Sequence, residues 1–167
     1  MLRIALTLAA SAMVMAPVAN AEIVSVPAAA FSPNTPVDFN DFGSDDEGVF
    51  KPANIVRLIA PVDFPRNGQK ICKMTLVHSD ENNNEDLIMQ LLRKTAVTGA
   101  LANATPPVIV AQVSSSGNSN TIRRASTTNI SPRKINDTSG FYYLKTFFVN
   151  VNLNFIGVQL DVKSTCP

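Results

Sequence analysis

The sequence predicts an all-β protein: a single antiparallel β-sandwich preceded by an extended, Pro-rich N-terminal arm. Short runs rich in β-branched and aromatic residues recur along residues 54–167. Clusters of Gly, Pro, Asn, Asp and Ser separate these runs, and several runs alternate apolar with polar residues. Short strands of this kind, divided by turn signals, are typical of a sandwich.

Residues 1–21 have the organisation of a cleavable export signal. Arg3 supplies a positive charge, and residues 4–18 form an apolar run of about 15 residues. Ala19-Asn20-Ala21 has the small-x-small pattern of a signal-peptidase cleavage site. A membrane-spanning helix needs about 20 apolar residues, so this run is too short for an anchor. We expect a bacterial secreted protein, extracellular or periplasmic, with no transmembrane segment after cleavage.

Composition restricts the function classes. Removal of 21 residues from 167 leaves 146, the size of one domain, with 13 acidic and 13 basic side chains. Nucleic-acid binding normally needs a basic excess, so we expect no nucleic-acid partner. Residues 22–90 carry a net charge of −6 and residues 91–167 carry +6. Either the two halves interleave in the fold, or the surface is dipolar and stacks head to tail.

Cys72 and Cys166 are the only cysteines. Two cysteines in an exported chain favour one intramolecular disulfide, with buried free thiols or pairing between chains as alternatives. A loop of 94 residues would contribute roughly 4–5 kcal/mol on the chain-entropy model.

Residues 22–53 are expected to form the N-terminal arm and an acidic loop, because four prolines preclude a regular helix there. Residues 22–26 could form a short edge strand.

The domain proper is expected at residues 54–167, beginning with a short apolar run at 55–60 and a turn at 64–68. Residues 70–78 alternate, with Cys72, Met74 and Leu76 on one face, as a half-buried strand does.

Residues 86–94 are compatible with two structures. Leu87, Met89 and Leu91 alternate as in a strand, but the apolar residues also fit one face of a helix that Asp86 would cap. Further strands are expected at residues 108–114, 121–128, 141–151 and 153–162. Residues 141–151 are apolar on both faces, which favours a core strand over an interface.

A set of strand and turn residues recurs in a fixed order from residue 60 onward: Ala60-Pro61-Val62, Phe64-Pro65, Gly68, Ile71, Asp86-Leu87, Leu91, Arg93, Ser116-Gly117, Tyr142, Leu144, Ile156-Gly157-Val158 and Leu160. In this order and spacing, the chain resembles a group of small secreted β-sandwich proteins and modules of bacteria. The likeness covers about two-thirds of the chain that follows the signal. It implies a jelly-roll-like sandwich, favours strand over helix at residues 86–94, and supplies no catalytic residues.

His78 is the only histidine, and no G-x-S-x-G elbow accompanies it. We expect His78 at a strand end, facing solvent, rather than in a catalytic triad.

Calcium is the one cofactor that the composition supports, since Ca²⁺ takes about six to eight oxygen ligands. Two acidic loops could provide them, neither with EF-hand spacing: Asp38, Asp41, Asp45, Asp46 and Glu47 in one, and Asp80, Glu85 and Asp86 in the other. The alternative is that both are solvated loops in which Asp and Asn serve turns.

The leading hypothesis is a non-catalytic secreted module that binds an extracellular or envelope component. A small secreted hydrolase that uses carboxylates of the acidic loops is one alternative. A self-assembling surface or matrix subunit, and hence a homo-oligomer, is the other.

Overall fold

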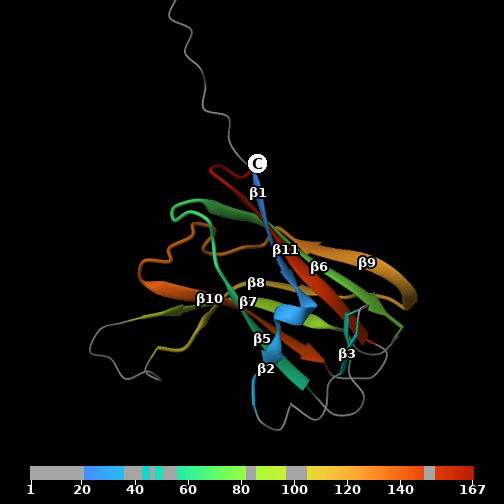
Figure 1. The fold of residues 1–167 in the computed structure, drawn as a ribbon. Helices are drawn as coiled ribbons and strands as arrows, with labels where there is room; N and C mark the ends of the chain where they lie inside the picture. Colours follow the sequence, from blue (N-terminus) through green and yellow to red (C-terminus); the bar gives the residue numbers. More distant parts are fainter. Residues whose placement is uncertain are drawn as a thin grey trace, which may run out of the picture.

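The computed structural model describes residues 21–35, 43–45, 48–50, 56–81, 86–96, 105–148 and 153–167. Two antiparallel β-sheets form a β-sandwich, which confirms the predicted all-β class (Figure 1). Within the described residues, the single helical element is the short 3-10 turn η1 (Ala28–Ala30). None of these residues belongs to a helix long and apolar enough to cross a membrane. The predicted signal lies almost wholly outside the described residues.

The first sheet has six strands. Its hydrogen-bonded order is β3 (Gly43–Asp45), β4 (Gly48–Phe50), β11 (Leu153–Lys163), β6 (Lys70–Asp80) and β9 (Ser119–Thr127). The sixth strand, β1 (Glu22–Pro27), pairs with β11 from Glu22 opposite Val162 to Pro27 opposite Gly157. The second sheet has five strands, in the order β2 (Ser32–Pro33), β5 (Val56–Val62), β10 (Gly140–Phe148), β7 (Ile88–Thr95) and β8 (Val108–Ser114).

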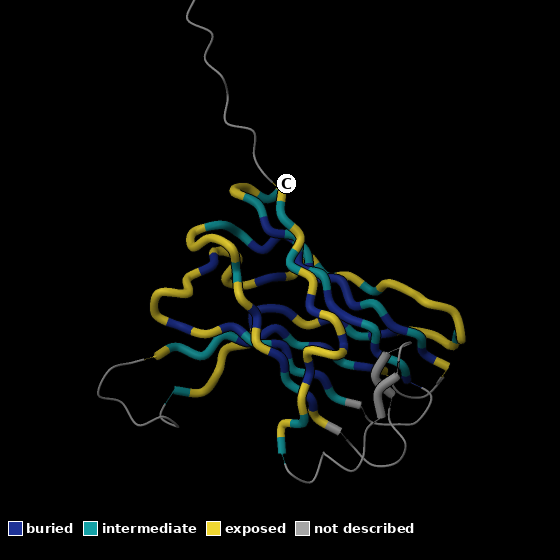
Figure 2. Tube along the Cα trace, in the orientation of Figure 1, coloured by how far each residue is buried: buried dark blue, intermediate teal, exposed yellow. Residues whose placement is uncertain are grey.

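The core lies between the two sheets, where each strand presents alternate side chains (Figure 2). Met74 and Leu76 on β6 and Leu160 on β11 are fully buried, as are Leu91 on β7 and Leu144 on β10. Alternation therefore identified the buried faces correctly.

Strand β10 lies between β5 and β7, as expected for a core strand. Tyr142 and Leu144 on one face are buried, whereas Phe141 on the other face is 69% exposed. Tyr143 and Phe147, on the same face as Phe141, are half-buried, so β10 is a core strand on one face and partly covered on the other.

Residues 88–95 are a strand, and this settles the ambiguity over residues 86–94. The pairing of Leu91 with Leu144 of β10 and with Ala111 of β8 fixes the register.

The N-terminal segment belongs to the sandwich where it is described. Residues 22–27 form the expected edge strand, and Val26, Ala28 and Phe31 are buried in the core. The ring of Phe31 meets that of Phe155 edge to face, with centroids 4.7 Å apart. Residues 22–33 are thus held by strand pairing and apolar burial rather than extending as a separate arm.

The two oppositely charged halves of the chain interleave. Strand β6 of the first half lies between β11 and β9 of the second, and β5 lies beside β10. Lys73 of the first half and Asp161 of the second form an ion pair, with Nζ and Oδ2 3.6 Å apart. Strands of the acidic half and of the basic half are therefore neighbours in both sheets within the described residues.

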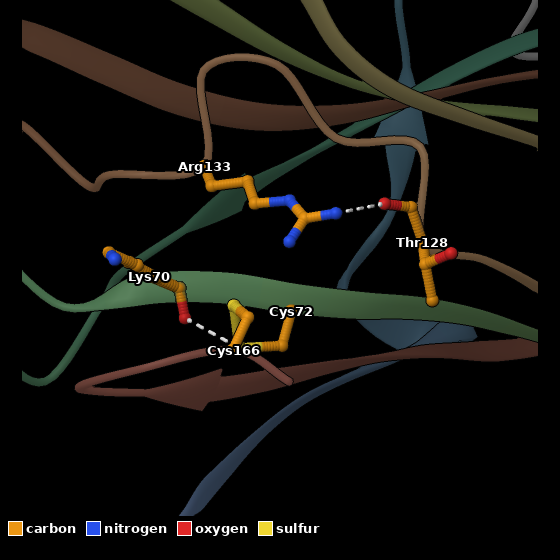
Figure 3. The surroundings of a disulfide bond; sticks show 5 residues. All are labelled: Lys70, Cys72, Thr128, Arg133 and Cys166. Atoms are coloured by element: carbon orange, nitrogen blue, oxygen red, sulfur yellow. Dashed lines mark hydrogen bonds between the residues drawn. A yellow bond between two sulfur atoms is a disulfide. The ribbon is translucent and has the colours of Figure 1, made fainter.

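The disulfide between Cys72 and Cys166 is confirmed, with Cα atoms 5.3 Å apart (Figure 3). It joins the start of β6 to the tail that follows β11. The Sγ atom of Cys72 lies 3.7 Å from the carbonyl oxygen of Lys70. This is a packing contact, because a disulfide sulfur carries no proton to donate.

Candidate functional site

A pocket of about 450 Å³ lies at the end of the sandwich where β6 and β10 begin and β7 ends. The β5–β6 connection (residues 63–69) and the β9–β10 loop (residues 128–139) form its walls together with one side chain of β7. Its described lining consists of Asn67, Gly68, Arg93, Pro132, Lys134, Ile135, Asn136 and Thr138.

The backbone of the β9–β10 loop is held in place by the start of β6. Ile135 is fully buried; its N–H donates to the carbonyl of Gln69 at 2.8 Å, and its carbonyl accepts from Gly68 at 3.1 Å. The N–H of Ile71 donates to the carbonyl of Arg133 at 2.8 Å. Gly68 has a φ of 86°, a conformation that glycine adopts without strain. The walls of the pocket are therefore preformed.

Arg93, on β7, is the lining residue with a side chain held by two hydrogen bonds and an aromatic ring. Its Nε–H donates to the carbonyl of Asn136 at 3.2 Å, and Nη2 donates to Oγ of Ser139 at 3.1 Å. The guanidinium carbon lies 5.9 Å from the centre of the Tyr142 ring, a cation–π distance. The Tyr142 hydroxyl in turn accepts from the N–H of Asn136 at 3.0 Å. The guanidinium is thus fixed from two directions.

Gly140 makes room for this guanidinium. A Cβ atom at position 140 would lie 2.9 Å from Nε and 3.2 Å from Cζ of Arg93, and 3.0 Å from the carbonyl oxygen of Lys94. Any larger residue at position 140 would push the Arg93 side chain away.

Amide and hydroxyl groups make up the rest of the polar lining. Nδ2 of Asn67 donates to Oγ1 of Thr138 at 3.3 Å, across the pocket, and this hydroxyl donates to Oδ1 of Asn136 at 2.9 Å. Arg93 and Lys134 provide two positive charges, and none of the described lining residues is acidic. The arrangement suits an anionic, hydrogen-bonding ligand.

His78 lies elsewhere, and the expectation that it faces solvent is wrong. Strand β6 continues to Asp80, so His78 shares the inward face with Leu76 and is 1% exposed. Burial lowers its pKa below the ordinary value of 6.5, while the Leu76 carbonyl and the Asp80 carboxylate act in the opposite direction. Neither ring nitrogen has a hydrogen-bond partner within the described structure.

Asp80, two residues after His78 on β6, bonds to Ser115, but these three residues do not form a catalytic triad. The Ser115 hydroxyl donates to the carboxylate of Asp80 and accepts from the N–H of Leu87 at 2.7 Å. In a triad, by contrast, the serine would bond to the histidine. Both Asp80 and Ser115 are buried, and their arrangement ties β6 to the segments that precede β7 and follow β8.

Most of the proposed calcium ligands fall outside the described residues. The side chains of Asp38, Asp41, Asp45, Asp46, Glu47 and Glu85 are not described. Of the others, Asp80 is buried and accepts from Ser115, whereas Asp86 is exposed. Among the described residues, no three His, Cys, Asp or Glu side chains gather as metal ligands would.

Gly68 and Arg93 are named above only among the residues of the resemblance, and the pocket residues were not grouped into a site because they are far apart in the chain. Positions 67–68, 93 and 132–138 meet only through the sheet topology. Residues 131–138 show in the sequence only a Pro- and Asn-containing segment with Arg133 and Lys134, a composition that is typical of a turn. No protein-family model matches the chain, and no curated protein has a significantly similar sequence.

Proposed function

We propose that the protein is an exported, non-catalytic β-sandwich module that binds an extracellular or envelope component in the pocket around Arg93. The observation that carries this proposal is the preformed pocket, in which Arg93 is fixed by two hydrogen bonds and by the Tyr142 ring. Ligand sites in proteins are usually concave, largely preformed and furnished with a few placed polar groups.

Export is supported by the signal-like residues 1–21 and by the disulfide, since such bonds persist in oxidising compartments. Cleavage after Ala21 would release the chain at the first residue of β1. Strand pairing could therefore begin at the new N-terminus.

A jelly-roll topology is supported by the strand order. If the short strands β2, β3 and β4 are set aside, the remaining eight form the sets β1-β11-β6-β9 and β5-β10-β7-β8. Two such interleaved four-stranded sheets correspond to the paired Greek keys of a jelly roll.

A binding role fits the chemistry of the pocket better than a catalytic one. The described lining contains no carboxylate, histidine or cysteine that could act as a general base or a nucleophile. The only histidine of the chain is buried in the core, away from this lining.

The test is retention of extracellular and envelope fractions on the immobilised, oxidised chain that begins at Glu22. Wild-type protein should retain material that the R93Q/K134Q variant does not, while R133Q should behave as wild type. Arg133 is a suitable control because it donates to the Thr128 carbonyl at 3.2 Å and does not line the pocket (Figure 3). Equal retention by R93Q/K134Q and wild type, or turnover of the retained material, would contradict the proposal.

A further inference from the structure

We propose that the pocket binds an anionic saccharide, with Arg93 as the principal ligand of the oxyanion and Lys134 as a second cation. This inference rests on the proposed function and names the ligand class of the same site. The oxyanion is a carboxylate or a phosphate carried on a sugar ring, since a guanidinium recognises both.

The charge of the site favours an anion. Arg93 and Lys134 line the pocket, and the isolated bridge between Lys70 and Lys134 brings a third cation to the same loop. With no acidic residue in the described lining, nothing there neutralises Arg93 or Lys134 at short range.

The hydrogen bonds of Arg93 leave donors for this anion. A guanidinium has five N–H groups. The contacts with Asn136 and Ser139 occupy the Nε–H and one N–H of Nη2. The remaining N–H groups of Nη1 and Nη2 can take two oxygens of one anion in the fork geometry that arginine provides and lysine does not. Because packing already holds the guanidinium, binding costs little further side-chain entropy.

The rest of the lining favours a saccharide as the carrier of the anion. The amides of Asn67 and Asn136 and the hydroxyl of Thr138 can donate to and accept from sugar hydroxyls. Exposed Pro132 supplies an apolar contact for ring C–H groups. The volume of about 450 Å³ is within the usual range for small-ligand sites.

Two other ligand types fit less well. No aromatic ring is among the described lining residues, so ring stacking cannot supply affinity for a neutral sugar. Peptides are usually bound along an exposed strand edge or in an apolar groove. The pocket instead has loop walls and polar side chains.

Gly140 acts as a positioning residue for Arg93. The G140A variant should displace the guanidinium, because its new methyl group would lie 2.9 Å from Nε. G140A should therefore weaken the binding of a charged saccharide. R93K should also weaken it, because lysine keeps the positive charge but lacks the bidentate geometry of the guanidinium. A purely electrostatic surface would tolerate both changes.

The experiment is calorimetric titration of the oxidised chain with oligogalacturonate, and with its methyl ester as the matched neutral ligand. We expect binding of the acid form, at least about tenfold weaker binding of the ester, and a similar loss in R93Q, R93K and G140A. K134Q should reduce both affinity and salt dependence, whereas R133Q should leave affinity unchanged. The affinities for glucose 1-phosphate and for glucuronate are compared in the same titrations. The tighter of the two ligands shows whether the site prefers a phosphate or a carboxylate. Thermal melts of each variant establish that it is folded.

Equal affinity for acid and ester, or unchanged binding by folded R93Q, would overturn the inference, as would tighter binding of poly-glutamate than of any anionic saccharide. Failure of the ligand class is distinguishable from failure of the binding function. If wild type retains envelope or extracellular material in an Arg93-dependent way but binds no anionic saccharide, only the ligand class is wrong. If it retains nothing, the proposed function itself is wrong.

Discussion

Reduction of the Cys72–Cys166 disulfide should destabilise the fold strongly. The bond closes a loop of 94 residues between the start of β6 and the tail after β11. Because β1, β6 and β11 are neighbours in one sheet, reduction frees the C-terminal tail without removing any strand pairing. The effect should therefore arise mainly in the unfolded chain, which gains conformational freedom.

The magnitude follows from the loop length. On the chain-entropy model, closing a loop of 94 residues stabilises the folded state by about 4.7 kcal/mol at 25 °C. For a domain of this size, each kcal/mol shifts Tm by several degrees, so reduction should lower Tm by about 10–20 °C.

Urea unfolding of the chain that begins at Glu22, with and without a reductant, measures the difference in the free energy of unfolding. The C72A/C166A variant is the control, and its unfolding should not respond to the reductant. A loss below about 2 kcal/mol in the wild type would refute the loop-entropy reasoning. It would indicate that the reduced, unfolded chain keeps residual structure.

Three further predictions concern the core. Burial lowers the pKa of His78 in the folded state below 6.5, so the unfolded chain takes up the proton first as the pH falls. The contribution of neutral His78 to the free energy of unfolding should therefore be complete above about pH 6.5 and decrease at lower pH. In urea unfolding at pH 7.5 and 5, the free energy of unfolding of the wild type should fall, relative to that of H78F, by up to about 1.4 kcal/mol per pH unit. Parallel pH profiles of the two proteins would contradict this. S115A removes the donor to buried Asp80 and the acceptor for Leu87, and should cost about 2–3 kcal/mol in urea unfolding without changing saccharide affinity; a loss below about 0.5 kcal/mol would rule out this role. G157A places a Cβ atom 2.9 Å from the carbonyl oxygen of Val26, so hydrogen exchange of β1 amides should accelerate while β10 stays protected; uniform protection would contradict the close packing of β1 on β11.

The sequence predicted most strands because burial of one sheet face imposes a period of two. Met74 and Leu76, or Val158 and Leu160, show that period over several residues. Residues 86–94 stayed ambiguous because a short apolar run fits both periods. Only the pairing of β7 between β10 and β8 distinguishes strand from helix there.

Two expectations were limited by the same physical fact, which is that local polarity does not reveal long-range partners. The polar residues after Val77 read as a loop, yet β6 extends to Asp80 because it pairs with β11 as far as Leu153, and the Ser115 hydroxyl satisfies the buried carboxylate of Asp80. The prolines at 27 and 33 suggested an arm, yet proline is tolerated at strand ends and sheet edges, where they lie in β1 and β2.

The candidate site could not be predicted because none of its residues forms a local motif. Arg93 is an unremarkable strand residue in the sequence, and its surroundings come from loops about 25 and 40 residues away. Its constraint depends on Tyr142, Asn136 and Gly140, which only the sheet register brings together.

An NMR titration tests the central claim most directly, because it locates the binding site as well as detecting binding. Amide shifts of the oxidised chain would be followed during addition of oligogalacturonate, with R93Q as the control. The account predicts shift changes confined to residues 67–69, 93–94 and 132–140, and absent in R93Q. Changes centred on residues 78–81, 86–88 and 115–119 at the opposite end of the sandwich, or identical changes in R93Q, would contradict it.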